Sequence, residues 1–136
     1  MNNLDHTRKL RRKQTAEDFT PIPLVNEMLD KLPYEVFIDP SKTFCDPAAG
    51  NGNFLVEVLK RKLINIHPLQ SLQTIYGVEL MEDNVEEMKE RLLSLIPEKF
   101  HKEAKIILDH NIICHHALTW DYENWKSKLS KPKALF

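Results

Sequence analysis

Two carboxylates and a glycine-containing loop are the parts of this sequence best suited to hold a small molecule. The loop DPAAGNGNF, residues 46–54, follows the short segment TFC at 43–45 and opens with Asp46. The second carboxylate, Glu79, lies in the apolar segment TIYGVEL at 74–80. A carboxylate repels phosphate and attracts an ammonium group, and its two oxygens can accept hydrogen bonds from both hydroxyls of a ribose. An amino acid joined to a nucleoside carries both groups, and S-adenosylmethionine is the common compound of this kind.

The loop differs from the two common phosphate-binding loops. Its Gly-Asn-Gly run at 50–52 is similar to the start of a dinucleotide-binding fingerprint, but Leu55 occupies the third glycine position, where a side chain obstructs close packing of helix on strand. The loop also lacks the Gly-Lys-Ser/Thr ending of a P-loop. The third and last glycine of the chain is Gly77, close to Glu79, so all three indicate that the backbone needs room at one place. We therefore expect a ligand site here rather than an ordinary turn.

Strand and helix patterns alternate along the chain. Strand patterns cover residues 43–45, 74–80 and 111–115. The helices between these strands, and one before the first, carry apolar residues at helical spacing: Val25, Met28, Leu29 and Leu32; Leu55, Val58, Leu59 and Leu63; Val85, Met88, Leu92 and Ile96. This alternation predicts parallel strands with right-handed crossovers, and therefore an α/β layered sheet whose ligands lie beyond the carboxyl ends of the strands.

Capping residues mark the expected helix ends. Thr20, which a proline follows, is the expected N-cap of the first helix, and Asp83 or Asn84 is that of the third. The tail at 120–136 has one candidate element, a short helix around Trp125.

Composition limits the class of protein. The chain has 136 residues, of which 42% are hydrophobic and 29% charged, and a formal net charge of -1, which fits one globular domain and argues against a surface that is basic throughout. We expect a basic segment at 1–18, which either meets phosphates or is a solvated terminus, and a ligand-binding domain at 19–136. No apolar run is long enough for a membrane span and no secretion signal is present, so we expect no membrane partner and a cytoplasmic location.

The cysteines and histidines predict no metal site. Cys45 and Cys114 each lie in a strand pattern, where a free thiol is expected to be a small buried hydrophobe. Cys114, His115 and His116 alternate between the faces of a strand, so they do not converge on one ion.

Taken together, these segments resemble the cofactor-binding half of adenine-specific DNA amino-methyltransferases. The loop at 46–54 resembles that family's cofactor loop, the FTP segment at 19–21 matches the segment that precedes it, and residues 75–80 resemble the acid-bearing second strand. The resemblance extends from about residue 14 to residue 122, and the order and spacing of its three segments make it specific. It implies a partial Rossmann-like sheet of class I methyltransferases, made of the first three strands with flanking helices, and S-adenosylmethionine as cofactor.

The resemblance implies a role for each matched position. Thr20 and nearby amides would receive the methionine carboxylate, Asp46 the ammonium group and Glu79 the ribose hydroxyls, while Leu80 would lie against the adenine. His116 stands where the family usually has an acid that accepts the adenine amino group; a neutral histidine can accept one such bond, or the residue has no specific role. The implied cofactor-binding residues are Phe19, Thr20, Pro21, Asp46, Ala48, Gly50, Gly52, Asn53, Phe54, Glu79, Leu80, His116 and Ala117.

One part of the family's pattern is missing. The Asn/Asp-Pro-Pro-aromatic segment, which follows a fourth strand and binds the target amino group of a flipped base, does not occur in the sequence. We therefore expect no catalytic residue and no methyl transfer by this chain alone. Because the family's first strand lies centrally in its sheet, here it would form an edge. Such an edge predicts a homodimer or a complementing subunit, with DNA reached through a partner chain.

Three hypotheses stay open from the sequence. The chain is the cofactor-binding portion of an adenine-specific DNA methyltransferase, either a fragment or one piece of a split enzyme. Alternatively, it is a complete small non-catalytic protein that keeps the pocket for cofactor binding or regulation. In the third hypothesis the pocket is vestigial and the chain is an interaction module, whose final Leu135 and Phe136 resemble the endings with which some replication-associated proteins dock on sliding clamps.

Overall fold

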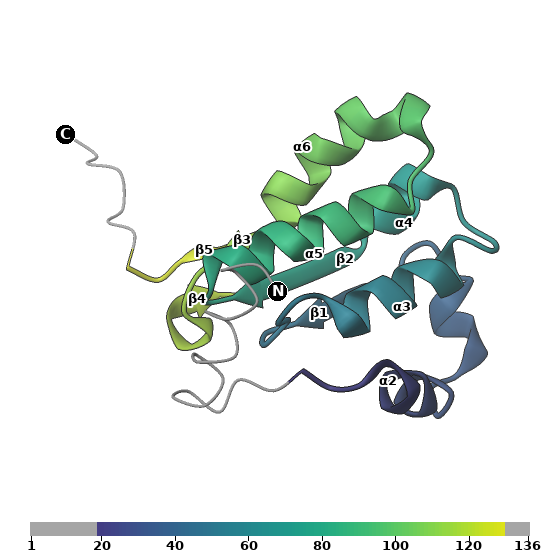
Figure 1. The fold of residues 1–136 in the computed structure, drawn as a ribbon, viewed down its shortest axis with the longest axis horizontal. Coiled ribbons are helices and arrows are strands. Elements are labelled where there is room, and N and C mark those ends of the chain that lie inside the picture. The colour runs from purple at the N-terminus through teal and green to yellow at the C-terminus, as the bar shows by residue number, and fades with distance from the viewer. Residues whose placement is uncertain (1–18, 130–136) are drawn as a thin grey trace, which may run out of the picture.

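The structure is a computed structural model that describes residues 19–129. Its centre is a three-stranded parallel sheet in the order β1-β2-β3 (Figure 1). The strands are β1 (Phe44–Asp46), β2 (Ile75–Glu79) and β3 (Ile112–Cys114). The predicted α/β class with parallel strands is confirmed, and the arrangement is compatible with a partial Rossmann-like methyltransferase sheet. Within the described range β1 is an edge strand, as expected. The basic block at 8–13 and the C-terminal Leu135 and Phe136 lie outside the described residues.

Helices connect the strands on one side of the sheet. The bounds of the α-helices are α2 (Ile22–Leu29), α3 (Asn53–Lys62), α4 (Pro68–Gln73), α5 (Glu82–Ser94) and α6 (His101–Asn111), with 3-10 turns at η1 (Tyr34–Phe37), η2 (Glu98–Phe100) and η3 (Ala117–Thr119). The sequence predicted α2, α3 and α5 and missed α4 and α6, which extend the two crossovers. No helix between residues 19 and 129 is long and apolar enough to cross a membrane.

The main core lies between α3, α5 and the face of the sheet that carries Ile75 and Ile112. Most of the residues predicted to point inward are buried: Val25, Leu29, Leu55, Val58, Leu59, Val85, Met88, Leu92 and Ile96. Met28 is instead 44% exposed, because α2 contacts α3 along a narrow stripe. Leu32 is 41% exposed because it lies beyond the end of α2. The predicted caps are wrong by one residue at α2, where Pro21 is the N-cap, and by two or three at α5, where Met81 is the N-cap.

The glycine of β2 is matched to a leucine of α3. A Cβ atom on Gly77 would lie 2.8 Å from Leu55 Cδ1 and 3.3 Å from the Cβ of Ala49. The leucine that was expected to obstruct close packing therefore fits over a strand position that has no side chain. Close approach of helix and strand is kept, with the small residue on the strand rather than on the helix. The space at Gly77 is thus filled by the protein and leaves no room for a ligand.

An aromatic cluster lies on the other side of β2. The expected helix around Trp125 is wrong: the segment is an antiparallel hairpin of β4 (Trp120–Asp121) and β5 (Lys126–Ser127). The Trp125 ring lies 4.8 Å from Tyr76 of β2 and 5.3 Å from Trp120, measured between ring centroids. Asp121 stabilises the turn, because its Oδ1 accepts hydrogen bonds from the amides of residues 123 and 124.

Both cysteines differ from the expectation of buried thiols. Cys45 and Cys114 lie in strands, as predicted, but both are exposed. Each strand is an edge of the described sheet, and alternation along β1 turns Phe44 toward the helices and Cys45 toward the opposite face. A strand pattern alone does not distinguish a central strand from an edge strand, which is why the predicted burial of these thiols is wrong.

Candidate functional site

A polar pocket opens at the carboxyl ends of β1 and β2, where an α/β sheet is expected to bind its ligand. Its volume is about 400 Å³, within the range of small-molecule sites. Three segments that are distant in sequence meet there: the FTP segment, the glycine loop and the end of β2. The lining residues are Phe19, Thr20, Asp46, Ala48, Ala49, Gly50, Asn51, Asn53, Phe54 and Glu79. Most of the predicted cofactor-binding residues are therefore brought together, and Ala49 and Asn51 join them.

The two loop glycines adopt conformations that other residues rarely take. Gly50 has φ 55° and Gly52 has φ 93°. A Cβ on Gly50 would lie 2.8 Å from Phe19 Cδ1, and a Cβ on Gly52 would lie 2.7 Å from Met88 Cγ. Gly50 thus lets the Phe19 ring lie against the loop, whereas Gly52 lets the loop pack on α5. Gly52 is next to the pocket but does not line it.

Asp46 is the last residue of β1, and its carboxylate stands at the pocket wall. Its Oδ1 accepts a hydrogen bond of 3.0 Å from the amide of Ala48, and no described residue donates one to Oδ2. Burial raises the pKa of Asp46, and the nearby charge of Glu79 raises it further, although the bond from Ala48 acts in the opposite direction. A cation at this position would relieve both unfavourable effects.

Glu79, at the end of β2, is fixed by three hydrogen bonds. Its Oε1 accepts from the amide of Gly50 at 3.1 Å, and its Oε2 accepts from the amide of Met81 at 3.0 Å and from Asn84 Nδ2 at 3.1 Å. The carboxylate therefore holds the loop and the first turn of α5 to the strand. An ionised carboxylate has about four acceptor positions, so these bonds leave about one for a ligand hydroxyl in this arrangement.

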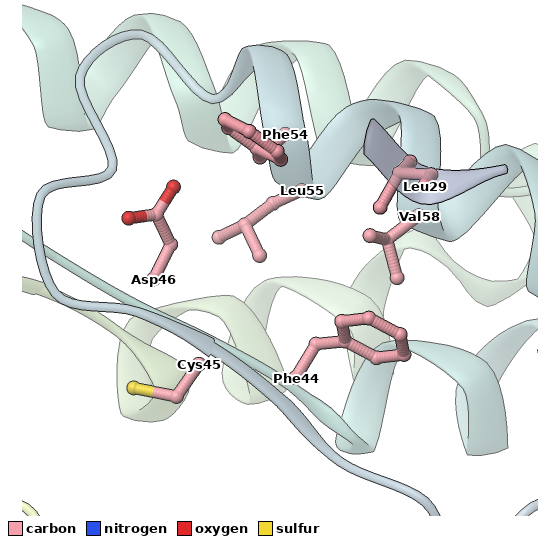
Figure 2. A pocket seen from close by; sticks show the side chains of 7 residues that line it. All are labelled: Leu29, Phe44, Cys45, Asp46, Phe54, Leu55 and Val58. Atoms are coloured by element: carbon pink, nitrogen blue, oxygen red, sulfur yellow. The ribbon is translucent and has the colours of Figure 1, made fainter. Parts of the chain in front are cut away.

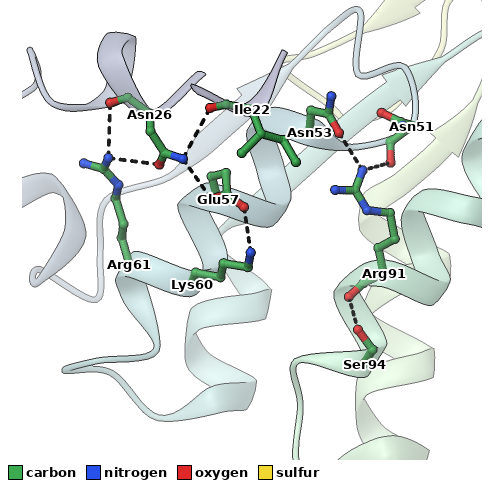
Figure 3. A network of polar contacts seen from close by, with 9 residues as sticks. All are labelled: Ile22, Asn26, Asn51, Asn53, Glu57, Lys60, Arg61, Arg91 and Ser94. Atoms are coloured by element: carbon green, nitrogen blue, oxygen red, sulfur yellow. Dashed lines mark hydrogen bonds and ion pairs between the residues drawn. The ribbon is translucent and has the colours of Figure 1, made fainter. Parts of the chain in front are cut away.

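Arg91 of α5 is a residue of the site that sequence reasoning missed. Its Nη1 donates to the carbonyl oxygen of Asn51 at 2.9 Å and to Asn53 Oδ1 at 2.8 Å (Figure 3). Asn53 in turn donates from Nδ2 to the carbonyl oxygen of Thr20 at 2.9 Å. No motif marks Arg91, because a basic residue in the last turn of a helix is ordinary. Only the packing of α5 beside the loop shows its position.

A second, apolar pocket adjoins the first beside the edge strand β1. Its volume is about 180 Å³, and Figure 2 shows its lining residues, which come from α2, β1 and α3: Leu29, Phe44, Cys45, Asp46, Phe54, Leu55 and Val58. Asp46 and Phe54 line both pockets. The carboxylate of Asp46 therefore stands where a polar cavity and an apolar one meet.

Five of the expected residues do not line the polar pocket, namely Pro21, Gly52, Leu80, His116 and Ala117. Leu80 is 53% exposed. His116 Nδ1 accepts a hydrogen bond of 3.1 Å from the amide of Leu118. A neutral histidine with Nδ1 as acceptor carries its proton on Nε2, which can then only donate. In this arrangement the ring has no acceptor for an adenine amino group.

Within residues 19–129, no three His, Cys, Asp or Glu side chains gather as metal ligands would. The histidines near β3 serve local contacts: His115 Nε2 lies 3.0 Å from Thr119 Oγ1, and His116 closes its own turn.

Part of the chain is similar to a known methyltransferase. Over 77 residues it is 35% identical to the Type II methyltransferase M.VspI of Vibrio sp. (strain 343). The matched segment makes up 57% of this chain and 16% of that protein, so the chain spans only a small part of this relative. No protein-family model matches the chain, and no solved structure matches it. The similarity supports a relationship to methyltransferases.

Proposed function

We propose that this chain binds S-adenosylmethionine as the cofactor-binding portion of an adenine-specific DNA methyltransferase, with residues 19–136 as the binding domain. The observation that supports this most is the polar pocket, in which Phe19 and Thr20, the glycine loop and Glu79 line one cavity. Those are the three segments on which the family resemblance rests. The partial similarity to a type II methyltransferase points in the same direction.

The charge of the pocket favours a cationic ligand over a phosphate. Asp46 and Glu79 line it, and no lysine or arginine is among its described lining residues. S-adenosylmethionine carries a sulfonium and an ammonium group, and when bound it supplies the methyl group for transfer. Asp46 would hold the ammonium group with its free Oδ2, and Glu79 would accept from a ribose hydroxyl.

Methyl transfer would need groups that the sequence does not supply. A methyl acceptor requires hydrogen-bond acceptors aimed at its amine, and the Asn/Asp-Pro-Pro-aromatic segment is absent from these residues. We therefore propose that the chain contributes cofactor binding and that catalysis and DNA contact depend on another polypeptide segment.

The edge of β1 is the proposed place of contact with such a segment. The amide of Phe44 donates a hydrogen bond to the carbonyl oxygen of Thr74, the residue before β2. Because backbone groups alternate in direction along a strand, the amide and carbonyl of Cys45 point away from the sheet. The apolar pocket lies beside this edge. A second copy of the chain or a complementing subunit would form hydrogen bonds with these free backbone groups and cover the apolar pocket. Light scattering should show a species larger than one chain, and a monodisperse monomer would contradict self-association.

Calorimetry with S-adenosylmethionine and S-adenosylhomocysteine tests the proposed function directly. Asp46→Ala and Glu79→Ala should each weaken binding by about 1.5 to 3 kcal/mol, because each removes a charge-assisted hydrogen bond. Glu98→Ala, an exposed acid in η2 outside the pocket, is the matched control and should bind as the original chain does. Unchanged affinity in both pocket variants, or no binding by the original chain, would refute the assignment.

A further inference from the structure

We propose that Arg91 and Asn53 act as positioning residues that hold the segment Phe19–Thr20 in place as a wall of the cofactor pocket. This inference rests on the proposed function, because it says how the binding site is built. We refer to the Arg91–Asn53–Thr20 chain of hydrogen bonds as the relay. It connects α5 through the start of α3 to the segment before α2, and these elements are far apart in sequence.

The relay starts from a well-anchored element. Val85, Met88 and Leu92 of α5 are buried against α3 and the sheet, so the helix that carries Arg91 is fixed by the core. One guanidinium nitrogen of Arg91 donates to two acceptors, the carbonyl oxygen of Asn51 and Oδ1 of Asn53, at 2.9 and 2.8 Å. Both acceptors belong to residues that line the polar pocket. The arginine therefore fixes the outer side of the loop without entering the cavity.

Asn53 links Arg91 to the segment Phe19–Thr20. Its Oδ1 accepts from Arg91 while its Nδ2 donates to the carbonyl oxygen of Thr20 at 2.9 Å. An amide has both an acceptor and a donor end, which a carboxylate lacks. The sequence resemblance assigned Asn53 to direct cofactor contact. Since both ends of its side-chain amide form hydrogen bonds within the protein, the structure favours a role in holding the pocket walls together.

The last bond of the relay holds Thr20 and so helps to position its neighbour Phe19. The Phe19 ring lies against Gly50, where even a Cβ atom would approach it to 2.8 Å. Phe19 and Thr20 both line the pocket, and the described contacts that hold them are this ring packing and the bond from Asn53. Without the relay, a ligand would have to order this segment when it binds, and that cost would reduce the affinity.

Two substitutions separate the steps of the relay. Arg91→Met removes the guanidinium group and keeps an unbranched apolar stem. Asn53→Asp keeps an acceptor for Arg91, replaces the donor to Thr20 by an oxygen and adds a negative charge at the pocket lining. Both should weaken S-adenosylmethionine binding by about tenfold, and the double variant should be no weaker than the worse single one, because the two residues act on one wall in series.

Arg61 provides the matched control. It too joins two helices, since its Nη2 donates to Asn26 Oδ1 of α2 at 3.1 Å (Figure 3). The same nitrogen donates to Oδ1 of Asp30, the residue after α2, at 2.7 Å. It contacts no residue that lines the polar pocket. Arg61→Met should therefore lower the unfolding free energy about as much as Arg91→Met while leaving the affinity within about twofold.

Hydrogen–deuterium exchange of the ligand-free protein gives a readout independent of cofactor. Arg91→Met and Asn53→Asp should speed exchange in peptides that begin at residue 19 and end before Asn26, and Arg91→Met also in those covering 46–54. Arg61→Met, whose bonds go to Asn26 and Asp30, should affect neither region. If the original chain binds no S-adenosylmethionine but exchange changes as described, the proposed function fails and the relay stands. If affinity and exchange in Arg91→Met and Asn53→Asp match those of Arg61→Met, the relay is refuted.

Discussion

Each end of the sheet holds a charged group that is buried or partly buried, and the two groups differ in how many hydrogen bonds they form with the protein. At the amino ends of the strands, Lys62 of α3 is fully buried, and its Nζ donates to the carbonyl oxygen of Lys42 at 2.6 Å and to Thr74 Oγ1 at 2.8 Å. At the carboxyl ends, Asp46 has one hydrogen bond from the described protein and faces a cavity.

Burial shifts both groups toward their neutral forms. It lowers the pKa of Lys62 and raises that of Asp46. The protein supplies partners for the lysine, so the lysine ties α3 to two strand ends and acts as part of the core. The carboxylate keeps one oxygen free at the pocket. A partly buried charge therefore indicates a ligand site only where some of its hydrogen-bonding capacity is unused.

The largest loss of stability is expected when the buried Lys62 side chain, at the amino ends of the strands, is removed. Lys62→Ala should lower the free energy of unfolding by about 2 to 4 kcal/mol, because it leaves a cavity and removes the donor to Lys42 O and to the buried Thr74 Oγ1. Lys60→Ala is the control on the same helix: the Lys60 side chain is 52% exposed and pairs with Glu57, so its loss should cost no more than about 1 kcal/mol. Urea unfolding measures both. Equal losses would mean that Lys62 is not a core residue.

At the carboxyl ends of the strands, stability depends on the backbone conformation of the glycine loop. Gly52→Ala should cost about 2 to 3 kcal/mol, because φ is 93° and the new Cβ would meet Met88 Cγ at 2.7 Å. Gly50→Ala should act mainly on ligand affinity, since its Cβ would displace the Phe19 ring from the pocket wall. Chemical unfolding and calorimetry on both variants separate the two effects, and the same profile for both would contradict this division.

A smaller effect should appear in the pH dependence of stability. The folded pKa of Lys62 lies below its ordinary value of 10.5, so the unfolded chain binds this proton more readily. The contribution of Lys62 to stability therefore rises as the pH increases from the lowered pKa to 10.5. Lys62→Met lacks this group, so the stability difference between the two proteins should grow over that range. A difference that stays constant in urea titrations from pH 7 to 10.5 would show that the pKa is not lowered.

The smallest effect should be a gain in stability when the charge of Asp46 is removed. The folded pKa of Asp46 lies above its ordinary value of 3.8, so its contribution to stability is present below pH 3.8 and is lost as the pH rises through the folded pKa. Ligand-free Asp46→Asn should therefore be slightly more stable than the original chain at pH 7, with no advantage below pH 3.8. Thermal unfolding at both pH values checks this. Lower stability at pH 7 would mean that the carboxylate is structural.

Much of the site followed from local chemistry in the sequence. The acid before a glycine loop and the acid at the next strand end were expected on one sheet edge, and both line the same pocket. Parallel strands force this, because their carboxyl ends meet on one side. The hairpin at 120–127 and helix α6 were missed, because short strands and a helix with an exposed Ile106 carry weak periodic signals.

The alternation of elements and the conformational freedom of the loop can be predicted from the sequence, since glycine, proline and apolar spacing act over a few residues. The burial of Lys62, the exposure of Cys45 and the bond from Arg91 to the loop cannot be predicted in this way. Those features depend on which elements become neighbours and which strand lies at an edge. Contacts between distant segments are set by packing, and no local pattern records them.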